Sequence, residues 1–368
     1  MKVILASGGS GGHIFPSVAL AGALEKQGVE EIYFVSSKRR LDKSILGKTK
    51  YKCFFLSINP MPFSKNPLKW LVFLIKFVWD TLRSFLILVR IRPVAVVGFG
   101  GYSSGPITRC AAMLHIPVAI HEQNFVPGRA NIILAKVADL IAVSFSDDEK
   151  HFSGCKGKVV FTGNPIRNNM LIDNKEEAAR FLGLDPAKPT VLIMGGSQGA
   201  TFLNNTAQAA AGIISAKLHD NVQFVHLTGN ANFDAVNRAY LDGKLNAKAI
   251  AFLDKMEMAY SAADVAISRS GAAAIFELAF YGIPMILVPY PNPKNSQRNN
   301  AMYFSNHGAA IYREESDLSA ESLADEAVKI LTDIDVWKKM SKASLSLARP
   351  EAADVLASEV IKLGRNGR

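Results

Sequence analysis

Short apolar runs alternate with segments of helical periodicity along the first half of the chain. The first run is residues 3–6 (VILA), and residues 15–27 then have the spacing of an amphipathic helix that ends at Gly28. Further β-branched runs follow at 31–35, 94–97, 118–120 and 140–143. Short apolar strands separated by helices are typical of a parallel sheet covered on both faces. The pattern therefore predicts an α/β domain.

The same pattern restarts in the second half. A polar segment with a charged helix at 175–182 leads into new apolar runs at 191–194, 223–227, 249–253, 265–268 and 285–288. A chain of 368 residues is also long enough for two domains. We predict a first α/β domain at 1–163 and a second at 164–344. A last helix at about 345–365 must dock to stay ordered and can pack back on the first domain.

Matching glycine loops open the two predicted domains. Residues 8–13 read GGSGGH, and residues 195–200 read GGSQGA, each between an apolar run and a helix. Glycine lets the backbone approach a ligand, and the first turn of a helix offers free N–H groups to a phosphate. Neither loop has the dinucleotide spacing GxGxxG, and neither is a GxxxxGK[ST] loop. A nicotinamide dehydrogenase is therefore poorly supported. One such loop could be a plain strand-to-helix turn, but two matched loops favour phosphate binding.

A third loop, SRSGAAA at 268–274, ends a predicted strand and opens a helix that carries Glu277. Amides at the helix start can take a diphosphate, and a carboxylate one to two turns on can accept both ribose hydroxyls. The alternative is a solvated helix residue. Because Glu277 lies within the apolar stretch AAIFELAFYG, where an unpaired carboxylate is costly, we favour the nucleotide role.

The net charge of +10 is uneven. Residues 1–163 hold 21 basic and 10 acidic residues, a net of +11, and residues 164–368 have a net of −1. This asymmetry indicates that the first half meets an anionic surface or ligand. Nucleic acid would fit the charge, but the chain has no zinc-finger spacing, RNA-recognition signature or basic run, so we predict no nucleic acid partner.

Residues 60–93 combine apolar and basic positions. Six Lys or Arg residues and Asp80 interrupt the apolar run too often for a membrane span. A helix lying in a membrane interface fits, and so does a helix that packs into the core of the first domain.

The three cysteines are widely separated and have no CxxC pair. The apolar run at the N-terminus is too short for a signal peptide. These features predict a cytoplasmic protein with reduced thiols.

A set of motifs occurs in order over nearly the whole chain: GGSGGH (8–13), GFGGYSSGP (98–106), HEQN (121–124), GNPIR (163–167), GGSQGA (195–200) and SRSGA (268–272), with Glu277 and Gln297. With this ordered set, the chain resembles the MurG family of peptidoglycan N-acetylglucosaminyltransferases. The resemblance implies a glycosyltransferase-B fold, two Rossmann-like domains facing across a deep cleft. It also implies inverting transfer of GlcNAc from UDP-GlcNAc to undecaprenyl-diphospho-MurNAc-pentapeptide (lipid I), which makes lipid II. The alternatives are a UDP-sugar transferase for another lipid and a non-catalytic sugar-nucleotide-binding scaffold.

The resemblance also implies roles for single residues. The uracil would meet the backbone near Leu253, and Glu277 would bind the ribose. The full donor set is Ser10, Gly11, Gly12, Asn124, Arg167, Ser197, Leu253, Ser270, Gly271, Ala272, Ala273, Ala274, Ile275, Phe276, Glu277 and Gln297. The acceptor set is Gly100, Gly101, Tyr102, Ser103, Glu122 and Gln123. Two departures stand out: Ser10 replaces the usual Thr, and Asn295-Ser296 replaces an acidic residue and His before Gln297.

His13 is the first candidate for the base that deprotonates the acceptor hydroxyl. It lies at a helix start, where the positive end of the helix favours a neutral imidazole. Its alternative is a structural or phosphate-binding role, and His121 and Glu122 are rival bases. No DxD-type pair lies near the motifs, so we predict no metal and no cofactor, with helix N-termini and amides easing UDP departure.

A polyprenyl-linked acceptor favours the interfacial interpretation of residues 60–93. We predict peripheral binding to the anionic cytoplasmic face of the inner membrane through Lys69, Trp70, Phe73, Phe77 and Trp79. The predicted partners are UDP-GlcNAc, lipid I and this membrane surface, with other cell-wall enzymes as further candidates.

Overall fold

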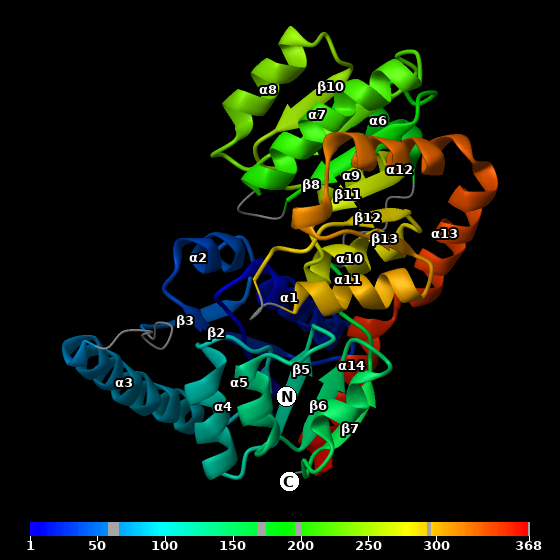
Figure 1. Cartoon of the computed structure of the whole chain (residues 1–368). Helices are drawn as coiled ribbons and strands as arrows, with labels where there is room; N and C mark the ends of the chain where they lie inside the picture. The colour runs from blue at the N-terminus through cyan, green and yellow to red at the C-terminus, as the bar shows by residue number, and fades with distance from the viewer. Residues whose placement is uncertain (58–65, 168–173, 196–199, 293–295, 367–368) are drawn as a thin grey trace. The chain divides into compact units, whose positions relative to one another are not determined.

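The computed structural model describes residues 1–57, 66–167, 174–195, 200–292 and 296–366. The chain divides into two compact units: unit 1 is Met1–Arg167 with Arg349–Arg368, and unit 2 is Asn168–Ala348 (Figure 1). The sequence placed the first boundary at 163. The first segment of unit 1 continues to Arg167. Gly163, at φ +81°, packs directly on Arg349, where a Cβ would come within 2.5 Å of the Arg349 Cβ. That contact joins the two segments of unit 1.

Unit 1 is built on a seven-stranded parallel sheet in the order β3-β2-β1-β4-β5-β6-β7. In register, Leu5 lies beside Phe34 on one side and Val97 on the other. β3 and β7, the two edge strands, are not among the predicted strands, although KCFFL and KVVF each contain a short apolar run. The strands are β1 (Lys2–Ala6), β2 (Glu31–Ser37), β3 (Lys52–Leu56), β4 (Ala95–Gly98), β5 (Val118–Glu122), β6 (Leu140–Val143) and β7 (Lys158–Phe161).

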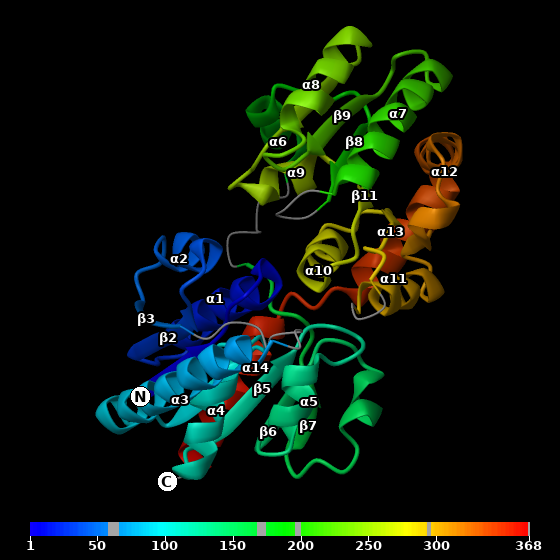
Figure 2. The ribbon, with the colours of Figure 1, turned by 60° about the vertical axis from the view of Figure 1, so that its left-hand side comes forward.

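Helices cover both faces of this sheet. One buried cluster joins α1 to α14, with Leu20 and Leu24 beside Leu356 and Val360, so the last helix completes unit 1. A second cluster joins α3 and α4 through Leu88 and Ile107. Figure 2 shows α14 together with the strands and helices of unit 1. The helices are α1 (Gly11–Lys26), α2 (Arg40–Leu46), α3 (Pro67–Ile91), α4 (Ser104–Met113), α5 (Arg129–Ala135), a 3₁₀ turn (Asp148–Phe152) and α14 (Ala352–Asn366).

Unit 2 has a six-stranded parallel sheet in the order β10-β9-β8-β11-β12-β13. Its strands are β8 (Thr190–Met194), β9 (Gln223–Leu227), β10 (Ala247–Ile250), β11 (Val265–Ser268), β12 (Met285–Leu287) and β13 (Ala310–Tyr312). The strand predicted at 249–253 ends at Ile250, so Leu253 lies in the loop that follows. The helices are α6 (Lys175–Leu182), α7 (Thr201–Lys217), α8 (Phe233–Asp242), α9 (Met256–Ala262), α10 (Ala272–Phe280), α11 (Gln297–Asn306), a 3₁₀ turn (Glu315–Asp317), α12 (Ala320–Thr332) and α13 (Ile334–Leu347).

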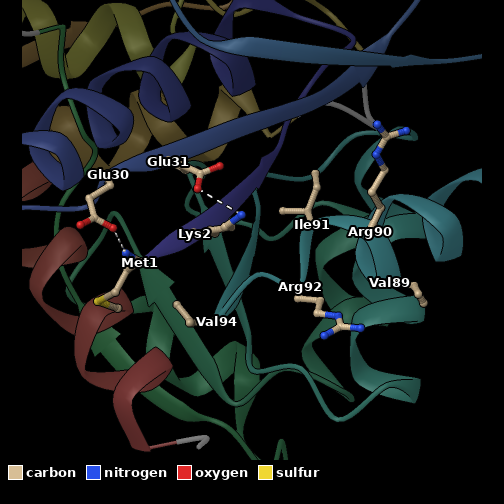
Figure 3. A pocket seen from close by; sticks show the side chains of 9 residues that line it. All are labelled: Met1, Lys2, Glu30, Glu31, Val89, Arg90, Ile91, Arg92 and Val94. Atoms are coloured by element: carbon tan, nitrogen blue, oxygen red, sulfur yellow. Dashed lines mark hydrogen bonds and ion pairs between the residues drawn. The ribbon is translucent and has the colours of Figure 1, made fainter.

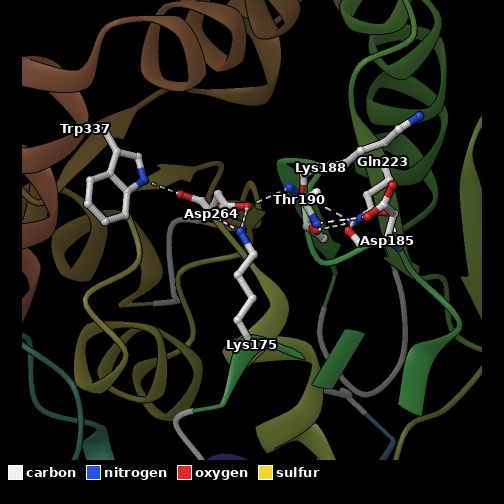
Figure 4. Close-up of polar contacts among 8 residues, drawn as sticks. Lys175, Asp185, Lys188, Thr190, Gln223, Asp264 and Trp337 are labelled. Atoms are coloured by element: carbon white, nitrogen blue, oxygen red, sulfur yellow. Dashed lines mark hydrogen bonds and ion pairs between the residues drawn. The ribbon is translucent and has the colours of Figure 1, made fainter. Parts of the chain in front are cut away.

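A polar network holds the amino edge of the unit 2 sheet (Figure 4). The Asp264 carboxylate pairs with Lys175 Nζ at 2.7 Å and accepts the Thr190 N–H at 2.8 Å. The Asp264 carbonyl accepts the Trp337 indole N–H at 2.8 Å. Nearby, Gln223 donates to the Asp185 carbonyl at 2.6 Å. These bonds tie α6 and α13 to the strand starts, so this edge is structural.

The amino edge of the unit 1 sheet carries an open hollow of about 600 Å³ (Figure 3). The Met1 amino group pairs there with Glu30, and Lys2 pairs with Glu31. The hollow is lined by residues at the starts of β1 and β2 and at the end of α3. The glycine loops follow the carboxyl ends of the strands, so this hollow is not the site that the motifs predict.

In both sheets the strand order reverses beside the first strand of the unit, between β1 and β4 and between β8 and β11. In open α/β sheets, ligands bind outside the carboxyl ends of the strands at such a switch point. The loop after β1 and the loops after β8 and β11 are the glycine loops of the sequence. The topology therefore places each predicted phosphate loop where its own sheet can bind a ligand.

Asp80 is an acidic residue that is buried in the packing of unit 1. It is fully buried on the inner face of α3 together with Ser84, and neither carboxylate oxygen has a hydrogen-bond partner in the part of the chain that the structure describes. A buried polar atom without a partner costs about 1–3 kcal/mol, and more when charged.

We therefore expect Asp80→Leu to raise the free energy of unfolding of the protein by about 1–3 kcal/mol, because an apolar side chain of similar shape leaves no unpartnered polar atom. Urea denaturation checks this, with Trp70 and Trp79 on α3 as fluorescent reporters and Trp337 reporting on unit 2. An unchanged or lower stability would contradict the interpretation of Asp80 as an uncompensated group.

Candidate functional site

The loop after β1 is packed so closely that it requires glycine. A Cβ on Gly8 would lie 2.6 Å from Ser103 Oγ, 2.7 Å from Asp42 Oδ2 and 2.8 Å from Ser36 Oγ. A Cβ on Gly101, which has φ +77°, would lie 2.5 Å from the Gly8 carbonyl oxygen. The motifs at 8–13 and 98–106, about ninety residues apart in the chain, therefore touch through their backbones.

His13 lies in the first turn of α1, half-buried, with its ring turned back onto this loop. Its Nδ1 is 3.1 Å from the Gly8 carbonyl oxygen and 3.3 Å from Ser10 Oγ. A carbonyl oxygen can only accept, so Nδ1 carries the proton of the neutral ring. Nε2 is then an acceptor, and no hydrogen bond to it is recorded within the described ranges. This tautomer leaves Nε2 able to take a proton.

The rival base His121 is held differently. Its ring is fully buried, Nε2 donates to the Gly163 carbonyl at 3.1 Å, and Nδ1 accepts from Gln123 Nε2 at 3.1 Å. Burial lowers the pKa of His121 to about 4, so the ring is neutral near pH 7. Both nitrogens are already engaged, which makes His121 a structural link from β5 to the chain segment after β7.

The other rival, Glu122, is a buried carboxylate that shapes its own loop. It accepts the N–H groups of Asn124 at 2.9 Å and Gly128 at 3.0 Å, and the Asn131 amide at 2.8 Å. Four donors in all, with the Asn124 side chain, surround its two oxygens. These four bonds occupy both carboxylate oxygens and fix the conformation of residues 122–131.

The remaining acceptor candidates line the same edge of unit 1. Gln123 is buried and donates to the Phe99 carbonyl at 3.2 Å. Ser103 is buried, and its Oγ has no hydrogen-bond partner among the described residues, whereas Tyr102 is 45% exposed. Gly100 has φ +84° and lies against Asn131. Tyr102 is thus the large side chain of this set that is free to meet a ligand.

In unit 2, the third loop leads into α10 as the sequence predicts. Ser270 is fully buried and donates to the Gln297 carbonyl at 2.8 Å, and Asn300 donates to the Ser270 carbonyl at 3.1 Å. Helix α11 therefore fixes the loop. Gly271 is the N-cap of α10 and has no side chain to cap the first N–H groups. Residues 272–276, the remaining donor candidates here, form the first turns of α10.

Glu277 is buried in α10 and accepts a hydrogen bond from the Tyr260 hydroxyl at 2.8 Å. It is therefore not a solvated helix residue. Its neighbour in the motif, Arg269, serves the fold of unit 2: it donates to the carbonyls of Val288 at 3.1 Å and Pro289 at 3.0 Å and pairs with Glu315.

The other donor candidates lie in several places. Arg167 belongs to unit 1, because its guanidinium stacks 4.7 Å above the Phe15 ring of α1. Gln297 opens α11 and accepts the Tyr290 N–H at 3.0 Å. Leu253 is half-buried in the loop after β10. Ser197 and Asn295 lie outside the described residues. Asn124, Ser10, Gly11 and Gly12 lie in unit 1.

Known proteins match this chain over its whole length. Residues 3–143 match the glycosyltransferase family 28 N-terminal domain, and residues 190–356 match the family 28 C-terminal domain. The relative in Halothermothrix orenii is named UDP-N-acetylglucosamine--N-acetylmuramyl-(pentapeptide) pyrophosphoryl-undecaprenol N-acetylglucosamine transferase. It is 36% identical, with 97% of each chain covered. The chain belongs to this family of glycosyltransferases.

Further members agree with this assignment. A transferase of the same name in Phocaeicola vulgatus is 37% identical over 100% of this chain and 99% of its own. The crystal structure of Acinetobacter baumannii MurG has a TM-score of 0.76 and 25% identity, with 98% of this chain and 99% of that chain covered. The predicted family and the predicted glycosyltransferase-B fold of two Rossmann-like domains are confirmed. The chain is a hexosyltransferase.

One residue of the site escaped sequence reasoning. Asp42 on α2 is fully buried and accepts the Gly9 N–H at 3.0 Å. A lone Asp in the segment SSKRRLDKS carries no motif, so only the fold connects it to the glycine loop. Among the residues that the structure describes, no three His, Cys, Asp or Glu side chains cluster as a metal site would require.

Proposed function

We propose that this chain transfers GlcNAc from UDP-GlcNAc to undecaprenyl-diphospho-MurNAc-pentapeptide, which makes lipid II for peptidoglycan. The observation that carries the proposal is the pair of phosphate loops at the two switch points, one beside a histidine with an available nitrogen and one leading to a buried carboxylate. The family names support the same donor and acceptor.

The proposal gives each unit a role. In unit 1, Nε2 of His13 takes the proton of the acceptor hydroxyl, whose oxygen attacks the anomeric carbon of GlcNAc. The bond from that carbon to the UDP oxygen breaks, and UDP leaves with the electron pair, so the configuration inverts. In unit 2, the α10 N-terminus takes the diphosphate and Glu277 takes the ribose. Amides and helix ends stabilise the leaving charge, with no metal required.

Transfer of radiolabelled GlcNAc from UDP-GlcNAc to a lipid I analogue tests the proposal, in buffer with EDTA and again with Mg²⁺. We expect turnover in the buffer with EDTA and in the buffer with Mg²⁺. Turnover only with Mg²⁺ would refute the metal-free step and leave the acceptor assignment intact. Binding of UDP-GlcNAc without transfer to lipid I, but with transfer to another lipid such as diacylglycerol, would show a different acceptor. Binding without any transfer would favour a scaffold.

We further propose that unit 1 binds the cytoplasmic face of the inner membrane through α3. This helix has no residue that is fully buried before Asp80, and its outer face exposes large apolar side chains. Trp70 and Trp79 are exposed, whereas Phe73 and Phe77 are half-buried and pack against the core cluster. The two tryptophans thus fit lipid contact, and the two phenylalanines serve mainly the fold. The exposed apolar residues are Leu68, Trp70, Leu71, Val72, Leu74, Ile75, Val78, Trp79, Leu82, Phe85, Leu86 and Val89.

The charges of α3 support an anionic surface. Lys69, Lys76, Arg83 and Arg90 recur every seven residues, about two helical turns, so they follow one flank of the helix beside the apolar face. This is the pattern of an amphipathic helix that lies in a membrane interface. In the part of the chain that the structure describes, no helix is both long enough and apolar enough to cross a bilayer.

Lys69→Gln with Lys76→Gln is expected to weaken binding to vesicles that contain phosphatidylglycerol by about thirtyfold, because each basic residue near an anionic surface contributes about 1 kcal/mol. Vesicle sedimentation measures the effect. The matched control is Lys338→Gln with Lys339→Gln, two exposed lysines of α13 in unit 2. Equal losses in both pairs would indicate a general charge effect and contradict a role for α3.

A further inference from the structure

Asp42 and His13 contact opposite ends of one peptide group. The Gly9 N–H donates to Asp42, 3.0 Å from Oδ2 and 3.2 Å from Oδ1. The Gly8 carbonyl, which belongs to the same peptide group, accepts from His13 Nδ1 at 3.1 Å. The path from the carboxylate to the imidazole is therefore Asp42 to N–H, through the planar amide, to C=O and then Nδ1–H.

The Asp42 carboxylate is held rigidly in place. It is fully buried, and it also accepts from Ser36 Oγ at 3.1 Å, Ser37 Oγ at 2.5 Å and the Ser37 N–H at 3.3 Å. Asp42 lies in the first turn of α2, where an anion is favoured. The three donors all bind Oδ2, and they hold the carboxylate against the Gly9 N–H.

We propose that Asp42 positions His13 and supports its protonated form through the Gly8–Gly9 peptide group, an inference that rests on the proposed role of His13 as base. Hydrogen bonds in series polarise one another, so a carboxylate on the N–H end makes the carbonyl end a stronger acceptor. A stronger acceptor at Gly8 keeps the proton on Nδ1 and leaves Nε2 as the base. When Nε2 takes the acceptor proton, the same chain stabilises the imidazolium, as a directly bonded Asp does in serine proteases.

The other charged and titratable groups around this loop do not supply the negative charge that stabilises a protonated His13. Arg39 donates to the Gly9 carbonyl at 3.0 Å, on the next peptide group, and is exposed. His121 on β5 lies near enough to His13 to sense its charge, but it is buried with both nitrogens engaged. Arg167 stacks on Phe15, two residues along α1. Asp42 is thus the anion that reaches His13 through the loop.

The first test reads the His13 tautomer and needs no substrate. In the full chain labelled with ¹³C,¹⁵N-histidine, His13→Asn identifies the His13 signals among the seven histidines. We expect the Nδ1–H tautomer in the wild type and a growing Nε2–H fraction in Asp42→Asn. Arg39→Gln, which also loses a contact with the loop, should keep the wild-type tautomer. A wild-type ring with the proton on Nε2 would overturn the proposal without any Asp42 variant, even if Asp42→Asn failed to fold.

The second test is the pH dependence of kcat/KM for GlcNAc transfer. Removing the anion destabilises the imidazolium, so Asp42→Asn should move the acid limb to lower pH. It should also lower the plateau by about 10- to 100-fold, the range for residues behind a metal-bound histidine. Asp42→Glu should restore part of the plateau and move the acid limb part of the way back to its wild-type position. A lower rate with an unmoved acid limb would reduce Asp42 to a purely structural residue. If the wild type shows the expected tautomer but no transfer, the proposed function fails while the link between Asp42 and His13 stands.

Discussion

His13→Ala is expected to lower the rate of GlcNAc transfer by about 10²- to 10⁴-fold, the usual contribution of a positioned general base. The structure gives the reason: Nδ1 is committed to the Gly8 carbonyl, so Nε2 is the atom that can accept the proton of the acceptor hydroxyl. The α10 N-terminus and Glu277 lie in unit 2, so the affinity for UDP-GlcNAc should fall far less than the rate. Single-turnover transfer and calorimetric binding of UDP-GlcNAc measure the two quantities.

His13→Asn separates loss of the base from loss of the contact with the loop. The Asn amide can still donate to the Gly8 carbonyl, but it has no basic nitrogen, so the loop is kept and the base is lost. The same change at the exposed His115, on the turn after α4, controls for loss of a histidine. Full activity of His13→Asn would show that His13 only supports the loop. Since the nitrogens of His121 and the oxygens of Glu122 are all engaged, another base would then have to be sought outside these three residues.

Glu277→Ala is expected to weaken binding of UDP-GlcNAc by about 100-fold. A hydrogen bond to a charged group contributes about 1.5–3 kcal/mol, and the carboxylate has two ribose hydroxyls to accept. Isothermal titration calorimetry measures the dissociation constant. Tyr260→Phe is the matched control, because it removes the hydroxyl that Glu277 accepts and keeps the carboxylate. It should change the affinity far less than Glu277→Ala does.

The ribose contact itself can be isolated with 2′-deoxy-UDP. If Glu277 accepts the 2′-hydroxyl, the loss caused by Glu277→Ala must shrink for the deoxy ligand, as in a double-mutant cycle. Equal losses for both ligands would place Glu277 in the packing of α10 against α9 and remove it from the donor site. Trp337 fluorescence reports whether unit 2 of each variant is folded.

The sequence alone was informative wherever function depends on local backbone. The glycine loops, the helix that carries Glu277 and the central strands could be predicted, because glycine spacing and apolar runs act through neighbouring residues. The amphipathic character of α3 was equally visible, since a seven-residue recurrence is a property of one helix. The ordered motifs also identified the family. The edge strands β3 and β7 are mostly half-buried and were not predicted, although each contains a short apolar run.

Only the tertiary structure decided how the candidate bases differ. His13, His121 and Glu122 are all residues that can act as a base. Their surroundings differ through bonds to Gly8, Gly163 and Gly128, which the fold supplies. Asp42 shows the same dependence, because it lies 33 residues from Gly9 and reaches it only where β1 and β2 end side by side. Parallel strands bring the residues after their carboxyl ends to one edge whatever their separation in the chain. Proton positions and carboxylate partners are set at that edge, and no local pattern in the sequence encodes them.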